Sequence, residues 1–246
     1  MEPSTYLDHL RRDLDRMLAT PADRLGDGVA ACPGWTVAEL LGHHAGVFRF
    51  ATAQLRAAPG SDFVPFDPPD GGVPPLEMLD IAGRELLAAF ADTDPSEHRP
   101  NWAGAPDATF WFRRMAHETA IHRVDAQLVH MTPDPIDTAL AVDGIDELGE
   151  VFLVHAGRRG ITGNGETVHL HATDAAVASG EIAGGEWMFR FHEDGVEVER
   201  SHGKGDMAVR APADQLVLFG WNRRPVEVEC FGEPDPLAFW ARTVRL

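Results

Sequence analysis

Residues 115–130, with the sequence MAHETAIHRVDAQLVH, constrain the fold more than any other segment. They include neither proline nor glycine, which predicts an uninterrupted helix. Glu118, His122 and Asp125 follow one another at spacings of four and three, so a helix projects them from one face. Side chains four apart have Cβ atoms about 5–6 Å from each other, so one metal ion could contact both a carboxylate and an imidazole. A hydrated surface pair would show the same spacing. Two rival histidines lie in the segment, His117 and His130.

A second segment, Cys32–Phe50, carries a matching signal. Thr36 with Glu39 three residues later forms a capping-box pattern, which predicts that a helix begins at Thr36. The buried stripe of this helix is predicted to contain Val37, Leu40, Leu41, Val47, Phe48 and Ala51. His44 falls in the centre of the stripe and His43 at its edge. Because a buried imidazole needs a hydrogen-bond partner or a metal, at least one of the two is unusual, and the periodicity leaves open which.

The stretches CPGWTVAELLGHHAG and HETAIHRVDA resemble the two signatures of the mycothiol-dependent maleylpyruvate isomerase family. The family's N-terminal domain is a DinB-like four-helix bundle, and its first signature places a histidine eight residues after a tryptophan. From Trp35 that residue is His43. The resemblance implies a divalent metal, usually zinc, held by His43, Glu118 and His122. The family commonly has an apolar residue where this chain has His44, which we therefore interpret as a core residue or one that supports a ligand.

Asp125 is predicted to orient His122 rather than to bind the metal, because ligating histidines commonly donate their second N–H to such a group. His117 lies beside Glu118 but points about 100° away, which predicts a surface or inter-domain position. Cys32 precedes Pro33 and is interpreted as a packing residue, and Trp35 as a core anchor for the helix start.

The composition limits the classes of partner. A length of 246 residues allows one large or two modest domains, and a hydrophobic content of 44% suffices for a globular core. The formal net charge of -18 argues against nucleic acid and against an anionic membrane surface. We expect no secretory signal, no membrane span, and free thiols at Cys32 and Cys230, as in a cytoplasmic protein. The single lysine, Lys204, among many arginines suggests a high-GC, actinobacterial source.

The N-terminal domain is expected to span residues 1–131 and to fold as a four-helix bundle. Its four segments of helical periodicity are 4–19, Thr36 to about Arg56, 75–91 and about 108–131. Gly83 interrupts the apolar stripe of the third. Residues 59–75 are rich in proline and form a long loop of the kind that often serves as a lid.

Residues 132–137, TPDPID, are the predicted hinge, and residues 138–246 the predicted C-terminal domain. We expect an α+β fold with a mostly antiparallel sheet, and the resemblance implies a sterol-carrier-like fold. His169 and His171 would share one face of a strand, but no third ligand is evident beside them, which favours sheet packing. The predicted helices are 143–157, 212–222 and 236–244, and the predicted strands 167–173, 187–192, 196–201, 207–210 and 226–231.

The family usually shows Trp-Gly-Arg where this chain has Trp221, Asn222 and Arg223. By that match Arg223 is the predicted catalytic and cofactor-binding residue, reaching toward the metal cleft to bind the anionic thiol or substrate. The planar fork of arginine suits a carboxylate. The simpler alternative is that Arg223 and Arg224 are solvated arginines at a helix end.

Three protein ligands leave one metal position open, as in catalytic zinc sites. In the family the thiol is mycothiol, and its zinc-bound thiolate would act on a small electrophilic substrate as an isomerase or an S-transferase. A metal-dependent hydrolase, with water in place of the thiol, and a non-catalytic binding protein are the alternatives. The protein is expected to be a monomer or a small homo-oligomer.

Overall fold

The computed structural model describes residues 1–58, 60–66, 72–175 and 185–245, so parts of the predicted 59–75 loop lie outside the described residues. The chain divides into two compact units, Met1–Asp134 and Pro135–Leu246. The first is helical and the second combines helices with a sheet, which confirms the predicted α+β fold class. None of the helices in these described ranges combines the length and apolar character that a bilayer-spanning helix needs.

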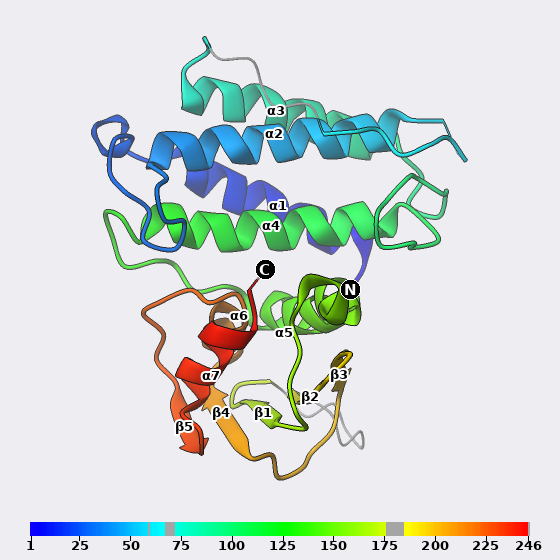
Figure 1. The fold of residues 1–246 in the computed structure, drawn as a ribbon. Coiled ribbons are helices and arrows are strands. Elements are labelled where there is room, and N and C mark those ends of the chain that lie inside the picture. The colour runs from blue at the N-terminus through cyan, green and yellow to red at the C-terminus, as the bar shows by residue number, and fades with distance from the viewer. Residues whose placement is uncertain (59, 67–71, 176–184, 246) are drawn as a thin grey trace. The chain divides into compact units, whose positions relative to one another are not determined.

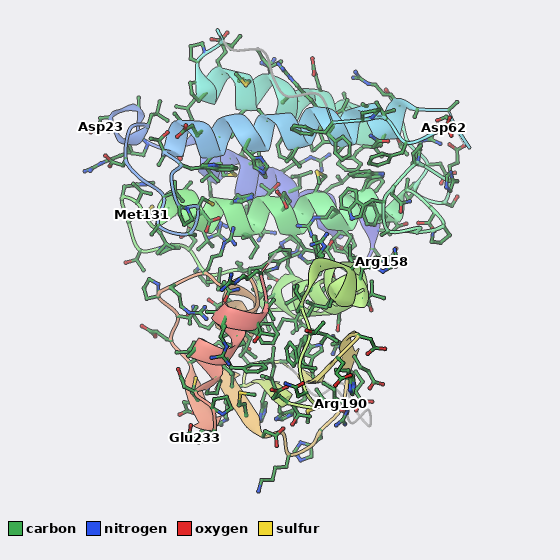
Figure 2. The ribbon with its side chains drawn as sticks, viewed as in Figure 1. Asp23, Asp62, Met131, Arg158, Arg190 and Glu233 are labelled. Carbon is green, nitrogen blue, oxygen red and sulfur yellow. The ribbon has the colours of Figure 1, made fainter. Side chains whose placement is uncertain are left out.

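Four helices build the first unit: α1 (Pro3–Leu18), α2 (Val37–Arg56), α3 (Pro75–Ala91) and α4 (Thr109–Gln127). Figure 1 shows α2 lying along α3, and α1 along α4. The loop near Asp23 before α2 and Met131, which follows α4, lie at one end of this unit, and Asp62, which follows α2, lies at the other (Figure 2). The helices α2 and α4 are therefore antiparallel, so an early turn of α2 meets a late turn of α4.

The start of α2 follows the predicted capping box. The Thr36 side chain accepts a hydrogen bond from the Glu39 backbone N–H at 3.3 Å, and the Glu39 carboxylate accepts one from the Thr36 N–H at 2.7 Å. The preceding loop supplies carbonyls from Leu25 and Asp27 to the first free N–H groups of the helix. The backbone N–H groups of the first helical turn have no partner within the helix, and leaving them unpaired is energetically costly. These hydrogen bonds therefore fix where α2 begins.

Helix α3 continues through Gly83, and the packing of α3 against α1 explains why glycine stands there. A Cβ atom at Gly83 would lie 2.5 Å from Cδ2 of Leu14 in α1, so the glycine lets the two helices approach closely. The fourth helix ends at Gln127, four residues before the predicted end. Its C-terminus is fixed by the following segment, because the Gln127 side chain accepts a hydrogen bond from the Asp134 N–H at 3.1 Å.

The second unit begins with α5 (Thr138–Glu147), followed by a π-helical turn, Leu148–Phe152, and a 3-10 segment, Leu153–Arg159. The predicted helix 143–157 was therefore wrong at both ends. The helix starts earlier because the Asp137 carboxylate caps it, accepting from the N–H groups of Ala139 and Leu140. This capping aspartate lies inside the segment that the sequence indicated as a hinge.

The sheet has the strand order β3-β2-β1-β4-β5, and only the β1–β4 pair among the described strands is parallel. Helices α6 (Ala213–Gly220) and α7 (Pro236–Thr243) bury one face of the sheet (Figure 1). There Phe189 packs edge-on against Trp240 with ring centroids 5.2 Å apart. The strands are β1 (Thr167–Ala172), β2 (Glu186–His192), β3 (Gly195–Glu199), β4 (Met207–Ala211) and β5 (Glu229–Gly232), the last shorter than predicted.

Candidate metal centre

Three side chains from α2 and α4 converge inside the helical unit. His43 lies in the second turn of α2, and Glu118 and His122 lie one turn apart on α4. One potential ligand atom from each lies within 4.8 Å of the other two. Glu118 Oε1 is 3.8 Å from His43 Nε2 and 3.2 Å from His122 Nε2. The structure thus brings the three predicted metal ligands together.

The two carboxylate oxygens of Glu118 have different partners. Oε2 accepts a hydrogen bond from Arg114 at 3.0 Å, and the Arg114 side chain is almost completely buried. Oε1 faces both histidines. Burial raises the pKa of Glu118, but the charge of His122, the hydrogen bonds from both histidines and the charge of Arg114 hold it well below its usual range. Glu118 is therefore an anion, the form that binds a metal.

His122 is oriented through its second nitrogen. Nδ1 lies 2.9 Å from Oδ2 of Asp125, which is buried. An N–H at Nδ1 donating to this carboxylate leaves Nε2 with a lone pair on the side of Glu118. Without a metal, burial lowers the pKa of His122, but Glu118 and Asp125 outweigh burial and raise the pKa to about 9. Asp125 thus has the orienting position predicted for it.

His44 is fully buried and belongs to the core beside the three ligands. Its Nε2 lies 3.1 Å from the Thr119 hydroxyl, whose own proton is donated to the Met115 carbonyl at 2.7 Å. The hydroxyl therefore accepts from His44 Nε2–H, which leaves Nδ1 unprotonated, and Nδ1 has no hydrogen-bond partner among the described residues. Burial and the positive charge of His122 lower the pKa of His44 to about 3.

The donor set fits a divalent transition metal. Two imidazole nitrogens and a carboxylate oxygen are ordinary zinc ligands. Bond lengths near 2.0–2.1 Å in a tetrahedral site place ligand atoms about 3.4 Å apart, close to the 3.2 and 3.8 Å between Glu118 Oε1 and the two imidazoles. Small side-chain movements would therefore suffice for His43, Glu118 and His122 to share one ion.

Two residues from the turn before α2 also lie at this site. Trp35 is only half-buried, and its ring centroid is 4.9 Å from that of His43, so it lines the site rather than anchoring the core. Cys32 Sγ lies within 4.8 Å of potential ligand atoms of His122 and Asp125, a position the packing interpretation missed. No local pattern predicts this approach, because it depends on how the 25–36 loop folds back. Arg114, by contrast, precedes Glu118 by four residues, a spacing that could have indicated the pair.

Two other predictions have different outcomes. His117 is buried, with its ring centroid 6.1 Å from that of Tyr6 in α1, so the predicted surface position was wrong, whereas the inter-domain alternative stays a prediction. Arg223 directly follows Asn222, whose φ of 56° is the left-handed conformation that glycine favours and asparagine tolerates. The substitution therefore keeps the turn. The Arg223 guanidinium donates to the Trp221 carbonyl at 2.8 Å, and its binding role stays a prediction.

The profile of the mycothiol maleylpyruvate isomerase N-terminal domain matches residues 7–127, and that of the C-terminal domain of the same family (MDMPI) matches residues 139–239. Two solved structures share the fold over 93% of both chains: a mycothiol-dependent maleylpyruvate isomerase, with 13% identity and a TM-score of 0.61, and a histidine-to-alanine variant of such an enzyme, with 14% and 0.64. No curated protein sequence matches the chain. The two domain profiles together span nearly all of the chain. The chain therefore belongs to the mycothiol-dependent maleylpyruvate isomerase family.

Proposed function

We propose that this protein is a divalent-metal enzyme, with zinc as the metal, that uses a low-molecular-weight thiol such as mycothiol to isomerise a small electrophilic substrate. The observation that carries the proposal is the convergence of His43, Glu118 and His122 within 4.8 Å. The names of the two structural relatives add the thiol and the reaction class, which we transfer to this chain as part of the proposal.

When bound, zinc would leave one coordination position open and lower the pKa of a thiol placed there. The protein's own residues have separate tasks. Glu118 supplies a negative ligand, and Arg114 keeps its second oxygen away from the metal position. Asp125 fixes the ring of His122. The Trp35 ring contacts the ring of His43 and so limits how far that imidazole can turn.

When bound, the thiol would supply a nucleophile able to add to an activated cis double bond. The sulfur lone pair would form the C–S bond as the π electrons move onto the activating group. After rotation about the resulting single bond, return of those electrons would expel the thiolate and leave the trans double bond, so no oxidant or reductant would be needed. An S-transferase would use the same first step but keep the C–S bond.

We further propose that Arg223 binds a carboxylate of the thiol or the substrate. Its guanidinium can donate two parallel hydrogen bonds to a carboxylate, which would orient the substrate as well as attract it. The left-handed turn at Asn222 supports this assignment, because asparagine and glycine can both adopt that conformation before the arginine.

The test measures metal content and thiol-dependent turnover of the same preparations, purified without chelator or histidine tag. We expect about one zinc at this centre and isomerisation of maleylpyruvate only with mycothiol present. His122→Ala should lose both, whereas His98→Ala, at an exposed histidine of the same unit, should lose neither. Turnover of ester or amide substrates without thiol would instead identify a hydrolase, and unchanged zinc in His122→Ala would exclude the proposed ligand set.

A further inference from the structure

A second group of metal-ligating side chains lies on the sheet of the C-terminal unit. Side chains of β1 alternate between two faces, and Val168 and Leu170 are buried on the face that packs against the helices. His169 and His171 therefore share the opposite face. The sequence indicated this pair but no third ligand beside it.

The neighbouring strand supplies the third ligand. Glu186 of β2 stands directly opposite His171 in the antiparallel register, and diagonally from His169. Its Oε2 lies 2.8 Å from His169 Nε2. Strand register is a long-range property, because residues 169 and 186 meet only through the pairing of β1 with β2, and a single-strand pattern cannot reveal it.

A third element brings His202 to the same carboxylate oxygen. His202 lies in the connection from β3 to β4 (Figure 1), and its Nδ1 is 2.7 Å from Glu186 Oε2. The connection is fixed on β1: Asp206 accepts hydrogen bonds from the N–H and hydroxyl of Thr167 at 2.9 and 2.8 Å. A Cβ at Gly205 would lie 2.7 Å from the Met207 carbonyl oxygen, so the backbone passes too closely for any side chain.

One nitrogen of this group is buried without a hydrogen-bond partner. His169 is 7% exposed, and among the described residues its Nε2 has no partner in hydrogen-bond geometry. The His169 Nε2 atom lies 2.8 Å from Glu186 Oε2, but the contact does not have the geometry of a hydrogen bond. A buried polar atom without a partner is costly, and a cation beside it would satisfy both the nitrogen and the carboxylate.

We propose that His169, Glu186 and His202 form a second divalent-metal site, independent of the centre in the helical unit. One ligand atom from each lies within 4.8 Å of the other two. Two imidazoles and a carboxylate favour zinc or a similar transition ion over calcium or magnesium, which prefer oxygen ligands. Binding would join β1, β2 and the β3–β4 connection, so the site stabilises the C-terminal unit. His171, with its ring centroid 6.3 Å from that of His169, is the nearest further imidazole for a fourth ligand.

The experiment uses the full chain with the His122→Ala substitution, so that zinc at the first centre does not obscure the second. We expect about one zinc per chain with half-saturation at micromolar free zinc, lost in both Glu186→Gln and His202→Ala. His192→Ala, at an exposed histidine of β2 that pairs with Glu197, is the matched control and should keep its zinc. Zinc should also slow backbone hydrogen exchange across residues 200–206 at least threefold, but not in Glu186→Gln.

Unchanged zinc binding in both Glu186→Gln and His202→Ala would overturn the proposal. Half-saturation only at millimolar zinc, or equal loss in His192→Ala, would indicate an adventitious ion only and would overturn it as well. The His202 side chain is 70% exposed, so its removal tests the site even where the change at Glu186 prevents folding. Because the first centre is already removed in this background, failure here leaves the proposed isomerase function unaffected.

Discussion

The Asp125 carboxylate and the His122 imidazole lie 2.9 Å apart, three residues from each other on one helix. This contact determines which nitrogen of His122 carries a proton, and so directs the other nitrogen toward Glu118 and His43. A buried carboxylate that is not one of the three proposed ligands can therefore influence the affinity of the proposed metal site.

Asp125→Asn should weaken zinc binding by about 10–100-fold while leaving the fold intact. The amide keeps the shape of the carboxylate but loses the charge that makes His122 a better ligand. Competition with a chromophoric chelator measures the affinity. An affinity equal to that of the unaltered protein would show that Asp125 has only a packing role.

In a Glu186→Gln background, which lacks the proposed second site, Glu118→Gln should lose most of the bound zinc, because the ligand charge disappears while the side-chain volume stays nearly the same. Elemental analysis after dialysis against a weak chelator measures the loss. Glu77→Gln, at an exposed glutamate of α3 in the same unit, is the control and should retain the metal. Equal zinc content in the two variants would contradict the assignment of Glu118 as a ligand.

Thr119→Val should destabilise the metal-free protein by about 1–3 kcal/mol, because it leaves the buried Nε2–H of His44 without an acceptor. Urea unfolding in the presence of chelator measures the change. In a His44→Leu background, Thr119→Val should lower the free energy of unfolding by less than it does when His44 is present, since no unpaired N–H remains. Strict additivity of the two changes would argue against the hydrogen bond.

The stability of the chelator-treated protein should have a maximum near pH 6.5, the pKa of an unfolded histidine. His122, with a folded pKa of about 9, stabilises the protein fully below pH 6.5, and this contribution is lost as the pH rises toward 9. His44, with a folded pKa of about 3, acts in the opposite direction: the unfolded chain binds a proton that the folded chain refuses, so stability falls as the pH drops below 6.5. Each slope should approach about 1.4 kcal/mol per pH unit.

Urea midpoints at several pH values check these slopes. His122→Gln should flatten the alkaline side of the profile, and His44→Leu should flatten part of the acid side, where Glu118 with its low pKa also contributes. Profiles that keep their shape in both variants would exclude the two histidines as the cause.

Arg223→Lys should raise the KM for the thiol or the carboxylate substrate, since lysine keeps the charge but loses the bidentate geometry. Steady-state kinetics with each reactant varied in turn would identify which of them Arg223 binds. Arg210→Ala, which removes an exposed arginine paired with Glu229 in the same unit, should leave both KM values unchanged. Unaltered kinetics in Arg223→Lys and Arg223→Ala would exclude the proposed role.

The features that the sequence predicted correctly depend on near neighbours in the chain. The start of α2 follows from Thr36 and Glu39, three residues apart, and the proximity of Glu118 to His122 follows from the pitch of one helix. The choice of His43 over His44 needed the family resemblance, because periodicity alone favoured neither as the ligand.

The features that the sequence did not predict depend on tertiary structure. Cys32 reaches His122 because the loop before α2 approaches α4, and Glu186 reaches His169 through the pairing of two strands. His117 contacts Tyr6 because α1 packs against α4. In each case two distant segments meet, and no spacing within either segment contains that information.

The division of the chain between Asp134 and Pro135 has an evolutionary consequence. All three candidate metal ligands, and the residues that orient them, precede this boundary. Recombination between related genes at this point would exchange the whole C-terminal unit, including Arg223, without disturbing the inherited metal centre. Exchange at this point would therefore separate the proposed carboxylate-binding residue from the proposed metal centre.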